Sequence, residues 1–149
     1  MMQAQVLQAG ASSSLLFVYG TLLSGLSNHH HMQGATCLGA ATLQGALFDL
    51  GAYPALLLTG QLSVPLGPVL GELYKIEASH WQLLDALEEV DPASIENSMY
   101  LRQTADVVWL APETPQTLTA QVYVYNWSLA GRPRIEHGDF RRHVSDKKT

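Results

Sequence analysis

The stretch that says most about the fold is Leu15-Leu16-Phe17-Val18-Tyr19-Gly20-Thr21-Leu22. Its apolar run ends at Gly20 and is too short for a helix, which is typical of a buried strand. Residues 20–35 are rich in Gly, Ser, Asn and His and follow no period, so they predict a loop. A buried strand that opens directly into a polar loop is therefore expected at the front of the domain.

Strand-like patterns recur further along the chain. They cover residues 41–50, 69–76, 105–110 and 118–127. Gly45 and Gly71 lie inside the first two segments and indicate bends or bulges, and turn-forming residues between these segments predict loops. In the last segment, Leu118, Ala120, Val122 and Val124 alternate with Thr119, Gln121, Tyr123 and Tyr125, which predicts one face toward the core and one polar face.

One helix is well marked and is predicted to begin near Ser79. Ser79-His80-Trp81-Gln82 matches a capping box, in which the Ser and Gln side chains satisfy backbone N–H groups at the helix start. The helix is expected to end near residue 89 or 90, since Asp91-Pro92 blocks its continuation. Strands on both sides of one helix, with no repeating strand-helix-strand unit, predict an α+β domain with a small, strongly curved sheet or barrel.

Length and composition limit the classes of protein that remain. With 149 residues, 47% hydrophobic and 14% charged, the chain predicts one folded domain. It has no apolar run long enough to cross a membrane, and its first 14 residues are not expected to act as a secretory signal. Its single cysteine, Cys37, excludes an internal disulfide and is expected to be a small buried residue. A cytoplasmic location is therefore expected.

Charge is distributed unevenly and suggests the domain limits. Residues 1–131 carry Lys75 and Arg102 against ten acids, whereas residues 132–149 carry six cations against three acids. Such an acidic body is not expected to bind nucleic acid, because neutralising phosphates requires clustered Lys and Arg. We predict an N-terminal extension over residues 1–14, a domain over 15–130 and a basic C-terminal tail over 131–149 that is solvated. Oligomeric state is not predicted.

The predicted helix places two adjacent glutamates, Glu88 and Glu89, on different sides. At about 100° per residue from Trp81, the leucines at 83, 84 and 87 centre an apolar face near 270°. Glu88 falls at the edge of this face, near 340°, while Glu89 and Asp85 fall on the outer side. Burial disfavours a charged carboxylate and raises its pKa, which makes Glu88 a candidate acid-base group. Alternatively, Glu88 is an ordinary boundary residue whose oxygens reach water.

Five short motifs carry a resemblance to a known family. They are Phe17-Val18-Tyr19-Gly20-Thr21-Leu22, Gly51-Ala52-Tyr53-Pro54-Ala55, Val69-Leu70-Gly71-Glu72-Leu73-Tyr74, Leu84-Asp85-Ala86-Leu87-Glu88 and Tyr100-Leu101-Arg102. In this order they resemble the landmarks of the gamma-glutamylcyclotransferase-like family, over about residues 15–127. The resemblance implies a small mixed β-barrel with flanking helices and a pocket where the Tyr-Gly-Thr-Leu loop faces a glutamate.

The resemblance also implies an activity and its residues. Tyr19, Gly20, Thr21 and Leu22 match the family's substrate-binding loop, and Glu88 matches its general acid-base glutamate. The implied reaction cyclises a small gamma-glutamyl amine or peptide to 5-oxoproline and releases an amine. The substrate supplies its own nucleophile and electrophile, so no cofactor or metal is expected. The alternative is a non-catalytic member of the same fold that binds a small ligand.

Some residues depart from the family pattern or stay unassigned. Leu23-Ser24-Gly25 follows the loop where the family usually has a basic residue, and Glu89 stands where the family commonly has glycine. His29-His30-His31 is not expected to bind a metal, because successive residues do not converge on one point. Two readings stay open for Tyr53-Pro54: it shapes the pocket wall, or it only makes its loop rigid. Four further residues are not assigned to the site: Tyr100, Arg102, Tyr123 and Tyr125.

Overall fold

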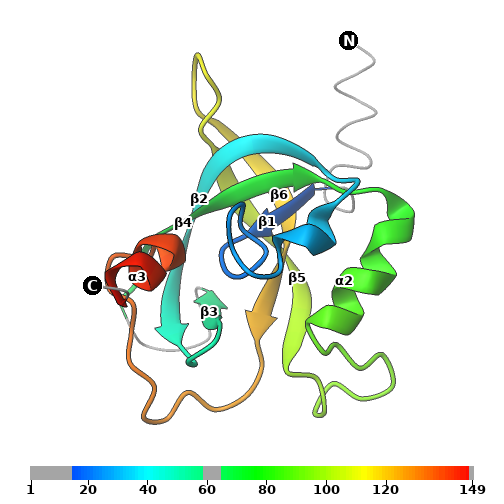
Figure 1. Cartoon of the computed structure of the whole chain (residues 1–149), viewed down its shortest axis with the longest axis vertical. Helices are drawn as coiled ribbons and strands as arrows, with labels where there is room; N and C mark the ends of the chain where they lie inside the picture. Colours follow the sequence, from blue (N-terminus) through cyan, green and yellow to red (C-terminus); the bar gives the residue numbers. More distant parts are fainter. Residues whose placement is uncertain (1–14, 59–64, 148–149) are drawn as a thin grey trace.

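The computed structural model describes residues 15–58 and 65–147, and its sheet closes into a barrel (Figure 1). The strands are β1 (Leu15–Val18), β2 (Thr36–Asp49), β3 (Pro54–Leu58), β4 (Gly67–Lys75), β5 (Tyr100–Trp109) and β6 (Gln116–Tyr125). They are ordered β3-β2-β4-β1-β6-β5, with β1 and β6 parallel and the other pairs antiparallel. A further pairing of β2 with β5 closes five strands into a mixed barrel, which confirms the predicted fold class.

Strand β2 makes the closure possible because it is long enough to pair with three neighbours. It pairs with β4 along most of its length, with β3 at its end, and with β5 through Ala41 and Thr42. The irregularity in its ladder lies between Cys37 and Gly39, not at Gly45 or Gly71 as the sequence suggested. Those two glycines instead allow close strand contacts: a Cβ at Gly71 would overlap the carbonyl oxygen of Val18.

Two hydrophobic clusters lie on the two sides of the barrel wall. Side chains such as Phe17, Leu73 and Val122 form one cluster. The other includes Leu84 of the helix α2 (Trp81–Leu87) and Tyr123. The predicted alternation along β6 is confirmed, but part of its second face is also buried: Tyr123 and Tyr125 are covered by α2 and the loop after β1, whereas Thr119 is exposed. This covered outer face of the barrel is where the site described below forms.

Helix α2 is shorter than predicted and differently oriented. The 3-10 turn η2 (Ala78–His80) precedes it, and neither start has a side-chain cap, so the capping box is wrong. The helix ends at Leu87 because Glu89 adopts a left-handed backbone with φ 56°. The buried face of the helix is also rotated from the predicted one, away from Leu83 and toward Asp85. Leu83 is 48% exposed, whereas Asp85 is half-buried against the barrel. Glu88 therefore lies nearer the middle of the packed face than its edge.

The left-handed residue predicts a stabilising substitution. Glu89→Gly is expected to raise the free energy of unfolding by about 1 kcal/mol, because a side chain at positive φ is strained and glycine is not. Urea unfolding at neutral pH measures the change. Glu89→Ala removes the same carboxylate without relieving the backbone, so it is the matched control. Equal stability of the two variants would contradict a backbone origin.

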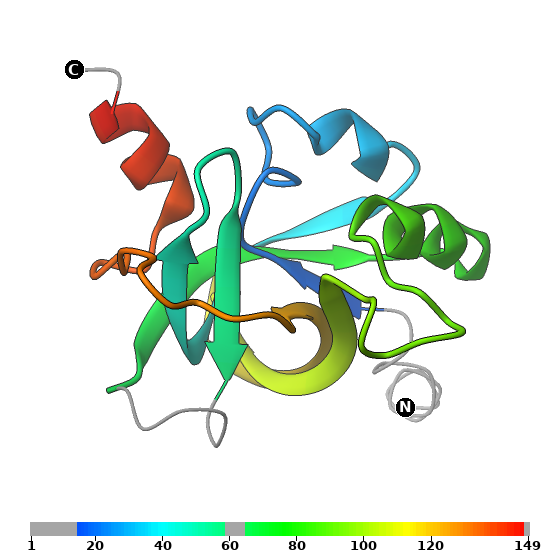
Figure 2. The same cartoon turned by 90° about the horizontal axis from the view of Figure 1, so that it is seen from below.

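The C-terminal segment packs on the barrel, opposite α2 (Figure 2). Helix α3 (Phe140–Lys147) buries Phe140, and Ile135 before it is also buried. The expectation of a solvated tail is wrong for the described residues, because these two side chains join the core and Arg134 pairs with Phe48 in a β-bridge. The predicted limit at residue 130 stays a prediction, and the predicted extension over 1–14 lies outside the described residues.

Three smaller observations complete the fold. Strand β3 occupies a region where the sequence predicted only loops. Cys37 is exposed at the start of β2, so its expected burial is wrong. None of the helices in the described part of the chain has the length and apolar character needed to cross a membrane.

Candidate active site

A pocket of about 230 Å³ forms between the loop after β1, the end of α2 and the start of β3. It brings together every residue that the sequence selected: Tyr19, Gly20, Thr21 and Leu22 face the same cavity as Glu88. The rest of its wall is largely aromatic and apolar: Phe17, Val18, Asn28, Tyr53, Pro54, Leu87, Glu89, Met99, Tyr100 and Tyr123. The segments that supply it are far apart in the sequence.

Glu88 is held at the end of α2 with its carboxyl group in the pocket wall. Its backbone N–H donates to Leu84 O at 3.0 Å, which continues the helical pattern for one residue. Burial raises the pKa of Glu88 to about 7, and the adjacent Glu89 carboxylate contributes to this rise. Within residues 15–58 and 65–147, no side chain or backbone N–H donates to the Glu88 carboxylate. Glu88 can therefore gain and lose a proton near neutral pH.

The loop after β1 is fixed by its own hydrogen bonds. Asn28 donates from its backbone N–H to Thr21 O and from Nδ2 to Thr21 Oγ1, both at 2.9 Å. The Leu23 N–H donates to Gly20 O at 3.0 Å. No described group accepts from the N–H groups of Gly20, Thr21 or Leu22. Consecutive backbone donors at the edge of a cavity are suited to an anionic oxygen.

Gly20 allows two segments to approach closely at the pocket wall. A Cβ at this position would lie 2.8 Å from Cδ and Cγ of Pro54, the first residue of β3. Pro54 is itself fixed, because the Tyr100 hydroxyl donates to Pro54 O at 2.6 Å. Of the two readings that the sequence left open for Tyr53-Pro54, the structure places Pro54 in the pocket wall, and the glycine-proline contact could be found only from the structure. It sets the distance between the loop and β3.

Three tyrosines that the sequence did not assign to the site, Tyr53, Tyr100 and Tyr123, line the pocket together with Tyr19. Tyr19 donates its hydroxyl to Tyr123 O, and burial raises the pKa of Tyr19 and Tyr100 above the usual value, with the Glu88 carboxylate adding to the rise. Both side chains therefore stay protonated. Tyr53 is partly exposed at the pocket mouth. Tyr123 and Tyr125, on the second face of β6, were the signal in the sequence that could have revealed these pocket residues. The sequence did not show that they are buried, because their burial depends on α2 packing over that face.

An ionic network anchors α2 to the barrel beneath the pocket. Arg102 of β5 donates from Nε to Asp85 Oδ1 at 3.0 Å and from Nη2 to Asp85 Oδ2 at 3.2 Å. Tyr123 donates to the same carboxylate at 2.6 Å, and the Arg102 guanidinium lies 4.4 Å from the Trp81 ring centroid. Asp85 lies one turn before Glu88, so these contacts fix the position of Glu88. Arg102 itself does not line the pocket.

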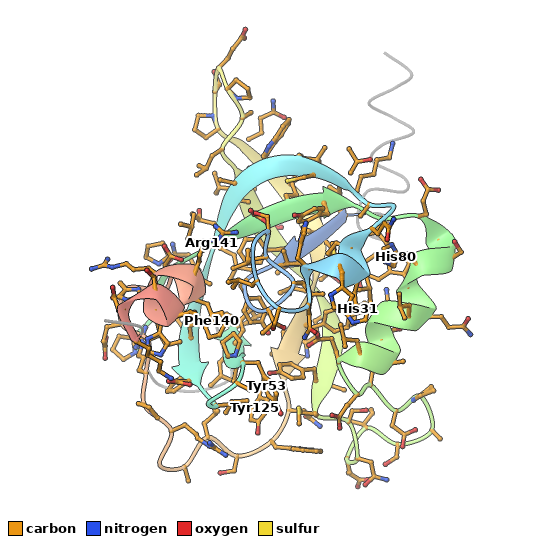
Figure 3. All side chains as sticks on the ribbon, viewed as in Figure 1. His31, Tyr53, His80, Tyr125, Phe140 and Arg141 are labelled. Carbon is orange, nitrogen blue, oxygen red and sulfur yellow. The ribbon has the colours of Figure 1, made fainter. Side chains whose placement is uncertain are left out.

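The histidine run has structural contacts. His29 Nδ1 lies 2.9 Å from Leu22 O, and His80 Nε2 lies 2.6 Å from His31 O, which connects the turn η1 (His29–Met32) to η2 (Figure 3). Within the described ranges, no group of three His, Cys, Asp or Glu side chains is arranged to hold a metal ion. These contacts connect the loop after β1 to η2 and α2.

Comparison with known proteins identifies the family. The gamma-glutamyl cyclotransferase, AIG2-like family matches residues 16–142, and this chain belongs to it. A Vibrio cholerae protein named as a candidate gamma-glutamylcyclotransferase is 37% identical over 132 residues, 87% of this chain and 97% of its own. The gamma-L-glutamyl-butirosin B gamma-glutamyl cyclotransferase of Niallia circulans is 37% identical over 113 residues, 74% of this chain and 66% of its own.

Solved structures agree with this assignment. A mouse AIG2-like protein superposes with a TM-score of 0.65 at 26% identity, covering 85% of this chain and 93% of its own. The solution structure of YtfP from Escherichia coli gives a TM-score of 0.57 at 30% identity, covering 87% of this chain and 98% of its own. The protein is therefore an enzyme of the gamma-glutamylcyclotransferase class.

Proposed function

We propose that the protein cyclises a small gamma-glutamyl amine to 5-oxoproline and releases the free amine, with Glu88 as the general acid and base. The observation that carries this proposal is the meeting of a half-buried carboxyl group, with a pKa of about 7, and a loop of unpaired backbone donors in one pocket. A cytoplasmic location stays a prediction.

The chemistry requires two protons to move from the α-nitrogen to the leaving nitrogen. The Glu88 carboxylate takes the first proton from the substrate's α-ammonium, and the resulting amine attacks the γ-carbonyl carbon to close a five-membered ring. The C–N bond to the leaving group then breaks as protonated Glu88 gives this proton to the departing nitrogen, and the ring nitrogen loses its second proton to the regenerated Glu88 carboxylate, which passes it to the released amine. A group with a pKa near 7 can act in both directions, because neither protonation state is strongly favoured.

In this proposal, backbone N–H groups of the loop after β1 stabilise the negative charges of the substrate and of the transition state. The N–H groups of Gly20, Thr21 and Leu22 would hold the substrate's α-carboxylate or the oxyanion that develops on the γ-carbonyl. The Tyr19 and Tyr100 side chains are fixed by their own hydrogen bonds and shape the walls against which the flexible glutamyl chain folds. Holding the substrate in its cyclising shape supplies a further part of the acceleration.

The test is a panel of gamma-glutamyl compounds assayed for both products. The purified protein is incubated separately with gamma-glutamyl amino acids, gamma-glutamyl alkylamines and gamma-glutamyl diamines, and 5-oxoproline and the free amine are quantified. Stoichiometric release of both from at least one compound is expected. Saturable binding of such compounds without any release would favour the non-catalytic alternative.

The pH dependence of turnover gives a prediction with a defined sign. Because Glu88 acts as a base, kcat/KM is expected to rise with pH through a midpoint near 7. Glu89→Gln removes a like charge that raises this pKa, so the midpoint should move to lower pH. Glu113→Gln, at an exposed position in the turn between β5 and β6, is the control and should leave the midpoint in place. A midpoint that moves up, or moves equally in both variants, contradicts the interpretation.

A further inference from the structure

The carboxylate of Glu72, on the wall of the barrel, holds a residue of the loop after β1. Glu72 belongs to β4, pairs with Val18 of β1, and has a side chain that is 14% exposed. The Ser24 N–H donates to Glu72 Oε1 at 3.0 Å, and the Ser24 hydroxyl donates to Oε2 at 2.6 Å. The Tyr74 hydroxyl donates to Oε1 at 2.9 Å. The barrel therefore holds both the backbone and the side chain of Ser24.

The C-terminal helix α3 holds the same loop residue. Arg141 reaches the loop after β1 from α3 (Figure 3), and its Nε and Nη2 donate to Ser24 O at 3.2 and 2.9 Å. The same Nη2 donates to Glu72 Oε2 at 3.0 Å. Burial by itself raises the pKa of Glu72, but the hydrogen bonds from Ser24, Tyr74 and Arg141 outweigh it and hold the pKa below its ordinary value of 4.5. Glu72 is therefore an anion at neutral pH, paired with Arg141.

These contacts of Ser24 with Glu72 and Arg141, here called the Ser24 clamp, fix one end of the turn that carries the unpaired backbone donors. The Leu23 N–H donates to Gly20 O, so residues 20–23 form one turn, and Ser24 directly follows it. None of the three clamp residues is among the described residues that line the pocket. The clamp can therefore affect the reaction only through the position of this turn.

We propose that Glu72 and Arg141 are positioning residues for the cyclisation, because together they hold Ser24 and so determine where the backbone donors of residues 20–22 meet the substrate. This inference rests on the proposed function and extends it to β4 and α3, two elements outside the pocket. The clamp takes no part in the proton transfers. It keeps the donors aligned with the anionic oxygen of the substrate while Glu88 moves the protons.

The clamp is expected to contribute more to turnover than to stability. Ser24 and Arg141 are exposed, and ion pairs at the surface contribute little to the free energy of unfolding. Helix α3 also has other anchors, because Phe140 is 2% exposed in the core and Lys147 lies 2.8 Å from Asp49. Loss of the Arg141 side chain should therefore leave α3 on the barrel and release only the loop.

Two substitutions open the clamp, one from α3 and one from β4. Arg141→Met removes the cation, and its matched control is Arg142→Met, which makes the same change in net charge at the next residue of α3, where the guanidinium extends toward Asp146 at 3.9 Å. Glu72→Gln keeps the size of the side chain but turns an NH2 group toward partners that are themselves donors. Its control is Tyr74→Phe, which removes one donor to the carboxylate without changing Ser24.

Kinetics with one gamma-glutamyl amine separates a positioning role from general damage. We expect Arg141→Met and Glu72→Gln each to lower kcat by about tenfold, with KM changed by less than about threefold, since the pocket stays open while its donors are displaced. The midpoint of the pH profile should stay near 7, because the surroundings of Glu88 are unchanged. The double variant should lose about as much as the larger single loss, because both residues hold the same Ser24. Both controls should keep the wild-type kcat.

The outcomes separate this inference from the proposed function. Wild-type kcat in both clamp variants, or equal losses in the controls, would overturn the positioning role while the cyclisation stands. Losses that multiply in the double variant, or a pH midpoint that moves with the loss, would also overturn it, because the residues would then act separately or through Glu88.

A second measurement tests the clamp without any substrate. Amide hydrogen exchange of residues 23–28 should be several-fold faster in Arg141→Met and Glu72→Gln than in wild type and should stay unchanged in both controls. Unchanged exchange in the clamp variants would overturn the inference. If the wild-type protein released no 5-oxoproline from any compound, the proposed function would fall, and faster exchange would still support the clamp as the contact that holds the loop.

Discussion

Glu88→Gln is expected to lower kcat/KM for 5-oxoproline release by about 10²–10⁴-fold, the range typical of a lost general acid-base group. Glutamine keeps the size and hydrogen-bonding capacity of the side chain but can neither take the proton from the α-ammonium nor return it to the leaving nitrogen. Glu89→Gln removes the next carboxylate in the sequence and is expected to retain at least about a tenth of the activity at pH values above the midpoint. Equal losses in the two folded variants would contradict the assignment of Glu88.

The same substitution has a second effect that does not depend on any substrate. Burial raises the pKa of Glu88 to about 7 from an ordinary value of 4.5, so between these pH values the folded state binds more protons than the unfolded state. The wild-type free energy of unfolding should therefore contain a contribution that falls as pH rises from about 4.5 through 7, by roughly 3 kcal/mol in all. Glu88→Gln should lack this contribution.

Urea unfolding of both proteins between pH 5 and about 8 measures this difference. The glutamine variant is expected to be the more stable of the two at the upper end, because the wild-type carboxylate is then charged in a poorly solvated position. If the free energies of unfolding of the two proteins changed with pH in parallel, the Glu88 carboxyl group would have to be well hydrated. The stability measurement and the kinetic measurement thus test burial and chemistry separately.

Local sequence patterns predicted the parts of this fold that depend on neighbours along the chain. The strand before Gly20 and the two-faced pattern of β6 follow from short-range periodicity, and both are present. The barrel closure between β2 and β5 joins Ala41 to Trp109, a contact between distant segments that no local pattern contains. The family resemblance, not the periodicity, supplied the expectation of a barrel.

Glu88 lines the pocket, but the helical-wheel argument that selected it was partly wrong. The helical wheel put Glu88 at the edge of an apolar face and Asp85 outside it, because it counted only apolar residues as inward. Asp85 in fact packs inward, paired with Arg102 and Tyr123. Polar residues can occupy a packed face when they are fully paired, and a pattern of hydrophobicity cannot report this. The raised pKa of Glu88 follows from that tertiary packing and from Glu89.

Gly20→Ala is expected to reduce kcat/KM by about 10²-fold while the protein stays folded. The new Cβ would lie 2.8 Å from two ring carbons of Pro54, so either the loop or β3 must move by several tenths of an ångström. Pro54 cannot rotate away, because its ring is rigid and its carbonyl accepts the Tyr100 hydroxyl at 2.6 Å. The loop therefore moves, and with it the unpaired N–H groups of Gly20, Thr21 and Leu22 in the pocket that Glu88 also lines. Displacements of this size reduce turnover strongly when catalysis depends on positioning.

The matched control is Gly67→Ala, at the start of β4, because a Cβ there meets nothing within 4 Å and the backbone needs no positive φ. Thermal unfolding of both variants reports stability, and saturation kinetics with one gamma-glutamyl amine reports kcat and KM. We expect Gly67→Ala to match wild type in all three and Gly20→Ala to lose mainly kcat, since the substrate can still enter a pocket whose donors are misplaced. Wild-type kinetics in Gly20→Ala would mean that the close contact with Pro54 has no part in setting the geometry of the loop, and the backbone donors would lose their place in the mechanism.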